Sequence, residues 1–144
     1  MATRRLAHGA SKLRTQIRAV VRYTRNFEVN LERIEAFWRD SDFPQGYDRL
    51  LDEIGERVIT NLEQHPRIGR SFWARKTDSI EALRRIEALR GKFGAEADFR
   101  EYLMTDYLVL YALIPAKAKT RAPHAETIHL LAIKHYKQLA FDLA

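Results

Sequence analysis

Cysteine is absent from this chain of 144 residues. Its absence excludes disulfide frameworks, thiolate metal sites and thiol nucleophiles, and it fits a reducing compartment, so we expect a cytoplasmic protein. Long apolar runs are missing too, since none approaches the roughly 20 residues that a membrane helix needs. The arginine-rich N-terminus lacks the apolar segment and the cleavage site of a secretory signal, although an arginine-rich start without acids also occurs in transit peptides.

Motifs for cofactor and metal chemistry are missing as well. There is no glycine-rich phosphate loop, no zinc-ligand spacing and no Gly-x-Ser-x-Gly. His124 and His129 lie on either side of an expected loop–strand boundary, a placement that does not make a ligand pair. We therefore expect no metal and no cofactor.

The composition is that of one globular domain. Apolar residues make up 46% and charged residues 31%, which excludes a disordered chain of low hydrophobicity. We expect a single domain over residues 18–144, preceded by a basic extension over 1–17 that is either helical or loose. The net charge of +6 is uneven, because residues 1–26 carry seven bases and no acid whereas residues 27–66 carry ten acids and four bases. This asymmetry suggests one face made for an anionic partner, although a solvated basic surface is equally compatible with it.

A strand and a helix are predicted at the start of the domain. Residues 19–24 form a short run rich in β-branched and aromatic side chains, as strands are. Apolar residues then recur at helical spacing over 27–38, and either Thr24 or Asn26 is in position to cap that helix.

A second helix is predicted from the clearest periodicity in the chain, over residues 47–62. Asp42 is expected as its cap, with Pro44 at its first helical position and Pro66 at its end. Two helices joined by a short turn form an antiparallel hairpin whose apolar stripes must cover another element. The residues expected to pack on a strand at 107–113 are Phe27, Leu31, Ile34, Trp38, Tyr47, Leu51, Ile54 and Val58.

A third helix is predicted over residues 78–92. Asp78 and Glu81 resemble a capping box, and Gly91 and Gly94 are expected to end the helix.

The last third of the chain changes to the period of strands. Strands are predicted over 99–104, 107–114 and 127–135, with a Thr-Asp turn between the first two and a basic exposed loop over 115–123 before the third. Residues 107–111 are apolar on both faces, so they belong in the middle of a sheet. The order of elements predicts an α+β fold in which the helices lie on one face of a three- to four-stranded antiparallel sheet.

Four segments in this order resemble the RelE/ParE superfamily of bacterial toxins. They are the helix Asn-Leu-Glu-Arg-Ile-Glu-Ala-Phe-Trp (30–38), the corner Asn-Leu-Glu-Gln-His-Pro-Arg-Ile-Gly-Arg (61–70), a hairpin (99–102 and 106–111), and Leu-Leu-Ala-Ile-Lys-His-Tyr-Lys-Gln (130–138). The resemblance covers roughly residues 18–140. The helix over 78–92 is longer than the link that the family has at this place, which indicates an enlarged subgroup.

This resemblance implies the toxin of a type II toxin–antitoxin pair, with a cognate antitoxin whose acidic amphipathic segment lies along the sheet and the helical hairpin. RelE-like members cut mRNA on the ribosome without a metal, using Arg and Lys with a Tyr or His, whereas ParE-like members act on DNA gyrase. Leu103 and Leu108 stand where the ribonucleases tend to carry basic residues, which favours the ParE-like function. A RelE-like endoribonuclease is the alternative, and a non-toxic basic binding protein on the same fold is the third hypothesis.

Site residues also follow from the resemblance. The candidates for target binding are Arg70, Lys76, Arg100, Lys134, His135 and Lys137, and those for catalysis in a ribonuclease are Arg100, His135 and Tyr136. We expect Arg100, Lys134, His135 and Lys137 to form one basic cluster. Structural roles are the alternative for some: Arg70 capping a loop, Arg100 pairing with Asp98 or Glu101, and His135 closing an apolar strand. Tyr107 and Tyr111 are expected in the core.

Overall fold

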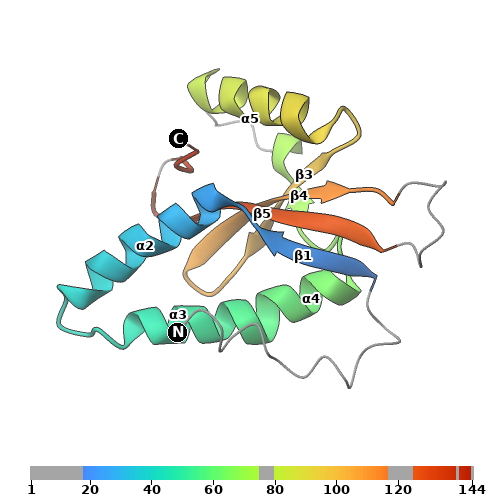
Figure 1. Cartoon of the computed structure of the whole chain (residues 1–144). Helices are drawn as coiled ribbons and strands as arrows, with labels where there is room; N and C mark the ends of the chain where they lie inside the picture. The colour runs from blue at the N-terminus through green and yellow to red at the C-terminus, as the bar shows by residue number, and fades with distance from the viewer. Residues whose placement is uncertain (1–17, 75–79, 117–124, 139, 144) are drawn as a thin grey trace.

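The computed structural model describes residues 18–74, 80–116, 125–138 and 140–143 (Figure 1). The predicted α+β class is confirmed. In chain order the elements are β1 (Ala19–Tyr23), α2 (Arg25–Arg39), α3 (Gly46–Glu53), a π-helical turn (Ile54–Val58), α4 (Ile59–Gln64), β2 (Arg70–Ser71), a 3-10 turn (Phe72–Ala74), α5 (Ile80–Phe93), β3 (Asp98–Leu103), β4 (Tyr107–Ile114) and β5 (Glu126–His135).

The strands form one five-stranded sheet in the order β1-β5-β4-β3-β2. β4 lies in the middle, as its apolar sequence predicts, and it pairs antiparallel with β3 and with β5. The prediction of a purely antiparallel sheet of three to four strands is wrong, because β1 pairs parallel with β5 and the two residues of β2 add an edge. Parallel neighbours need a long crossover connection, and here most of the chain lies between β1 and β5.

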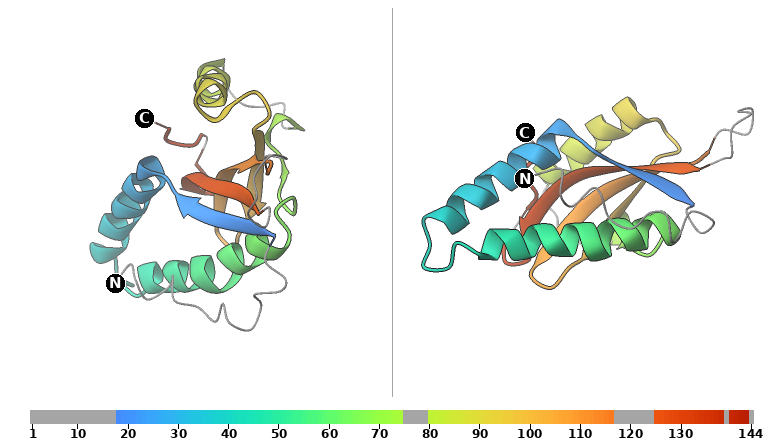
Figure 2. Two further views of the ribbon diagram at one scale, coloured as in Figure 1. Left: turned by 45° about the vertical axis from the view of Figure 1, so that its right-hand side comes forward. Right: turned by 60° about the horizontal axis from the view of Figure 1, so that its bottom comes forward.

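The helical hairpin lies against one face of the sheet, with α2 followed by the nearly continuous helix of α3 and α4 (Figures 1 and 2). Of the two candidate caps of α2, Thr24 is the one used, because its Oγ1 accepts a hydrogen bond of 3.2 Å from the backbone N–H of Phe27.

The second helix begins at Gly46, two residues after Pro44, which was expected at its first position. Asp42 is exposed and does not cap it, because a turn intervenes in which the N–H of Gly46 donates to the carbonyl of Phe43 at 3.0 Å. A Cβ on Gly46 would stand 2.4 Å from Cε3 of Trp38. The close approach of the two helices at this turn therefore requires glycine, which fixes where the second helix begins.

The expected contacts between hairpin and sheet are confirmed for seven of the eight residues, whereas Leu51 is buried without belonging to the core that the hairpin shares with the sheet. Phe27, Leu31, Ile54 and Val58 share a core with β4 and β5, and Ile34 and Tyr47 pack against that core. Trp38 reaches β4 through a hydrogen bond of 3.1 Å from its Nε1 to the hydroxyl of Tyr107, and Leu51 is 2% exposed.

The third helix lies on the opposite face, which corrects the prediction that all helices share one face (Figure 1). Ile86 of α5 is fully buried in a second core with Phe99, Leu110 and Leu131, strand residues that point away from the hairpin. This arrangement explains why β4 is apolar on both faces: each face has its own helical cover. α5 runs through Gly91 and ends at Gly94, whose φ of +103° is a left-handed C-cap.

Several sequence-based predictions lie outside the described residues, namely the extension over 1–17, Lys76, the cap Asp78 and the basic part of the loop at 117–121. None of the helices that the structure describes has the length and the hydropathy needed to cross a bilayer.

Candidate functional site

The candidate site residues fall into two groups along the sheet. Arg100 of β3 is in register with Tyr111 of β4, whereas Lys134 of β5 is in register with Leu108. Three strand residues separate these levels, which corresponds to about 10 Å. The expected single cluster therefore does not form. β3 and β5 end at the same end of the sheet with β4 between them, and Arg100 is placed too early in β3 to reach Lys134.

Arg100 and Arg70 instead fasten a loop to the sheet. Arg100 donates from Nη1 to the carbonyls of Gly69 and Arg67, at 2.6 and 3.0 Å, and from Nε to Asp98 at 2.8 Å. Arg70 pairs with the buried carboxylate of Glu101 at 3.1 Å. Both guanidinium groups are engaged by the fold, which bears out the structural alternative of an Arg100–Asp98 pair.

Tyr111 of β4 also binds this loop, through its hydroxyl. The Tyr111 hydroxyl accepts from the N–H of Gly69 at 3.0 Å and donates to the carbonyl of Pro66 at 2.9 Å. Burial raises the pKa of Tyr111 to about 12, so the phenol stays protonated. A Cβ on Gly69 would lie 2.6 Å from the carbonyl oxygen of Glu101. The Pro-x-x-Gly-Arg corner in this chain is therefore a packing motif.

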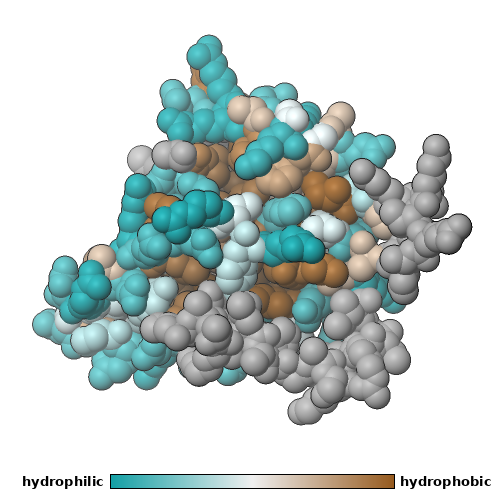
Figure 3. Space-filling view, in the orientation of Figure 1, coloured by the Kyte–Doolittle hydropathy of each residue, from teal (hydrophilic) through white to brown (hydrophobic). Residues whose placement is uncertain are grey.

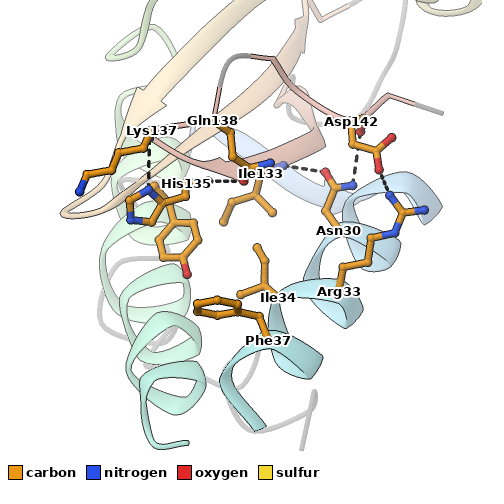
Figure 4. A pocket seen from close by; sticks show the side chains of 10 residues that line it. Asn30, Arg33, Ile34, Phe37, Ile133, His135, Lys137, Gln138 and Asp142 are labelled. Carbon is orange, nitrogen blue, oxygen red and sulfur yellow. Dashed lines mark hydrogen bonds and ion pairs between the residues drawn. The ribbon is translucent and has the colours of Figure 1, made fainter. Parts of the chain in front are cut away.

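A cavity of about 580 Å³ lies between α2 and the end of β5 (Figure 4). Ile34 and Phe37 of α2 and Ile133 of β5 point into it, and Phe37 is 66% exposed. The ring of Tyr107 completes the apolar part of the lining. Burial raises the pKa of Tyr107 above its ordinary value, so this phenol also stays protonated. The cavity is therefore an apolar recess open to the surface.

A polar rim borders the cavity on the side of the C-terminal tail. Arg33 pairs with the carboxylate of Asp142, and Asn30 donates to the Asp142 carbonyl at 3.3 Å (Figure 4). Asn30 is nearly fully buried and its Oδ1 accepts from the N–H of Ile133 at 2.9 Å. Tail, helix and strand are thereby joined by one chain of polar contacts.

On the other side of the cavity lies the turn after β5, with His135, Tyr136 and Lys137. The backbone N–H of Lys137 donates to Nδ1 of His135 at 3.1 Å, so a neutral His135 ring carries its proton on Nε2. The imidazole stacks on the half-exposed ring of Tyr136, with centroids 4.7 Å apart. Lys137 extends away from the other lining residues and is exposed (Figure 4).

Lys134 is not available to a partner. It is 2% exposed, and its Nζ donates to the carbonyl of Gln138 at 2.6 Å and lies 5.3 Å from the ring centroid of Phe141. Of the expected target-binding residues in the described part of the chain, His135 and Lys137 are the two that line the cavity.

The sequence-based reasoning missed Arg33, Phe37 and Asp142. Phe37 had a signal, because it follows Ile34 by one helical turn and widens the apolar stripe of α2 beyond what one sheet face covers. Nothing in the sequence pointed to Asp142, whose partner lies more than a hundred positions earlier in the chain.

The site has the composition of a binding surface. It offers an apolar recess, the exposed cation Lys137 and a histidine N–H, whereas the charge of Arg33 is already paired with Asp142. The described residues contain no group of three or more His, Asp or Glu side chains placed to hold a metal ion. Such a site accepts an apolar side chain that has an anionic group next to it.

Comparisons with protein-family models, with curated proteins and with solved structures gave no match.

Proposed function

We propose that this chain is the toxin of a type II toxin–antitoxin pair of the RelE/ParE kind. In this proposal it works in the bacterial cytoplasm and stops growth by binding a macromolecular target such as DNA gyrase. The order of elements supports it: an early strand, a helical hairpin and a terminal antiparallel β3-β4-β5 meander are the pieces on which the resemblance rests.

The dispersal of the cations is the observation that carries the ParE-like form of the proposal. Arg100 and Arg70 are bound to the corner loop and to Glu101, and Lys134 is buried. Cleavage of RNA by its own 2′-hydroxyl needs several cations around one phosphate, and each lost donor costs about 3–4 kcal/mol of transition-state stabilisation. A chain in which Arg70 and Arg100 are bound within the fold is better suited to binding than to phosphoryl chemistry.

A RelE-like endoribonuclease is the second candidate, because His135, Tyr136 and Lys137 lie together beside the cavity. The hydrogen bond to Nδ1 weakens this candidate. A general base needs a free ring nitrogen to accept a proton, and in the neutral ring Nδ1 already accepts from Lys137 while Nε2 carries its hydrogen. His135 is thus arranged to donate.

The cavity also suits the expected antitoxin. An acidic amphipathic segment would place an apolar side chain between Ile34 and Phe37 and a carboxylate near Lys137.

The test is expression in bacteria that lack the partner protein, with colony counts, plasmid supercoiling and protein synthesis measured after induction. We expect loss of viability with loss of negative supercoiling. Phe37→Ala with Lys137→Glu should restore growth, whereas Ile68→Ala, which truncates an exposed apolar side chain on the corner loop, should not. Normal growth with the parent chain would leave the non-toxic binding protein, and an immediate stop of protein synthesis would favour the ribonuclease.

A further inference from the structure

A second group of basic side chains lies on the α5 face of the sheet, away from the cavity. Arg22 of β1 and His129 of β5 are register partners, so their side chains stand next to each other on one face. The next residue of β5 on this face is Leu131, which belongs to the α5 core. Arg22 and His129 therefore point to the same side as α5.

The end of α5 brings a third basic side chain to this place. Phe93 packs on the imidazole of His129 with ring centroids 4.9 Å apart, and the Nζ of Lys92 lies 5.6 Å from the Phe93 centroid. Three elements thus contribute to this place: Arg22 of β1 lies next to His129 of β5, and Phe93 of α5 contacts both His129 and Lys92. We call Arg22, Lys92 and His129 the α5-side patch.

The patch carries positive charge that the described part of the chain does not neutralise. Arg22 and Lys92 are exposed, and neither forms an ion pair with a described residue. Burial lowers the pKa of His129, and the charges of Arg22 and Lys92 lower it further, without an acidic side chain that offsets this effect. An anion bound here would meet uncompensated positive charge and would favour the charged form of His129.

The surface around the patch differs from the cavity in being mixed and open. Figure 3 shows hydrophobic residues between α5 and the strands in front of it, bordered by hydrophilic ones. The His129 and Phe93 rings pack on each other in a tilted arrangement, so each ring has one face in contact with the other. Binding at this place would therefore depend on charge and on hydrogen bonds from the basic groups.

The chain that enters this sheet edge is also basic. Ala19 of β1 is in register with Glu126 of β5, so the two strands begin at the same end of the sheet. The sequence before β1, residues 1–17, contains four lysines and arginines and no acid, and residues 117–124 before β5 contain three and no acid. These segments are not part of the patch, but they are joined to the edge that carries it.

We propose that the α5-side patch binds the phosphate groups of a nucleic-acid backbone. Separate cations on an open surface match a ligand that presents one charge at regular intervals, and no recess is needed for a side chain. The net charge of +6 gives the same sign of attraction at long range. The binding is independent of base sequence and strongly dependent on salt. It goes beyond the proposed function, because it adds a nucleic-acid contact to the expected contact with a target protein.

The test measures binding of the full purified chain to fluorescent oligonucleotides, one single-stranded RNA and one DNA duplex, by anisotropy at several salt concentrations. We expect binding that weakens steeply with salt. In Arg22→Gln with Lys92→Gln the affinity should fall at least about tenfold, and the slope of log K against log salt should fall by about 1.8 on duplex DNA or 1.4 on RNA. The arm that binds more tightly identifies the nucleic acid.

The matched control is Arg39→Gln with Arg57→Gln, which removes the same charge from exposed positions on the two hairpin helices. Its affinity should stay within about twofold of the parent chain at equal thermal midpoint. Equal losses in both variants would overturn the patch and leave only a diffuse net-charge effect. Absence of binding in both arms, or equal displacement by polyglutamate, would overturn it as well. Growth arrest without nucleic-acid binding would overturn this proposal alone. Binding without growth arrest would overturn only the proposal that the chain is a toxin.

Discussion

Tyr111→Phe removes one oxygen atom and tests what holds the corner loop to the sheet. The ring of Tyr111 is fully buried in the core between β4 and the helical hairpin, and phenylalanine keeps that packing. The lost hydroxyl has two partners, the N–H of Gly69 and the carbonyl of Pro66, and both residues are buried. The substitution therefore leaves a buried donor and a buried acceptor without their bonds.

The cost follows from those two groups. A buried polar group that loses its partner costs about 1–3 kcal/mol, and relaxation of the loop recovers part of it, so we expect about 2–4 kcal/mol for Tyr111→Phe. In a chain of this length that corresponds to a midpoint roughly 6–12 °C lower.

The assay is urea and thermal unfolding followed by circular dichroism. Tyr136→Phe is the matched control, because that ring is half exposed and its loss of a hydroxyl should cost under about 0.5 kcal/mol. If Tyr111→Phe is as mild as the control, the hydroxyl does not hold the loop and the reasoning is refuted.

Further predictions concern packing and pH. Leu51→Ala should lower the free energy of unfolding by about 2–5 kcal/mol, because the side chain is 2% exposed. A urea midpoint equal to the parent's would contradict tight packing around this residue of α3. Gly69→Ala should destabilise the fold by about 1–3 kcal/mol, since its Cβ would lie 2.6 Å from the carbonyl oxygen of Glu101. Gly91→Ala should stabilise it by about 0.5–1 kcal/mol, because nothing lies within 4 Å of the added Cβ. Changes of the same sign in both variants would contradict the surroundings described for the two glycines. Because the pKa of Tyr111 is raised to about 12 in the folded chain, stability should fall as pH rises from about 10 to 12, and Tyr111→Phe should flatten that fall in unfolding curves. Because the pKa of His129 is lowered, stability should fall as pH drops below about 6.5, and His129→Gln should remove that part of the pH dependence.

The fold was predictable where a local pattern dictates the structure. The stripes of α2 and of the second helix, and the double-sided apolar run of β4, each follow from periodicity, and the structure confirms them. The position of the turn before β4 also sets the register of the hairpin, in which Arg100 pairs with Tyr111. Strand order and direction do not follow from periodicity, so the parallel pairing of β1 escaped prediction, and β2 is too short to show a period.

The site was less predictable because its side chains depend on backbone groups far away in the sequence. Arg100 was expected to face a target, but besides Asp98 it binds two carbonyls of the corner loop, and backbone carbonyls carry no signal in the residue types. Lys134 was expected to bind a target, but the turn after β5 folds back and the carbonyl of its Gln138 accepts a hydrogen bond from the ammonium group. His135 and Lys137 lie near each other as expected because they are only two positions apart in the chain.

Ribosome-dependent cleavage of mRNA is the measurement that tests the central claim most directly. The purified chain is added to a reconstituted translation reaction at a concentration that inhibits gyrase supercoiling, and mRNA ends are mapped by primer extension. The account predicts intact mRNA, because the cations needed around a phosphate are bound within the fold. A cut at a fixed position within codons, abolished by His135→Ala, would contradict the account and make the chain a ribonuclease.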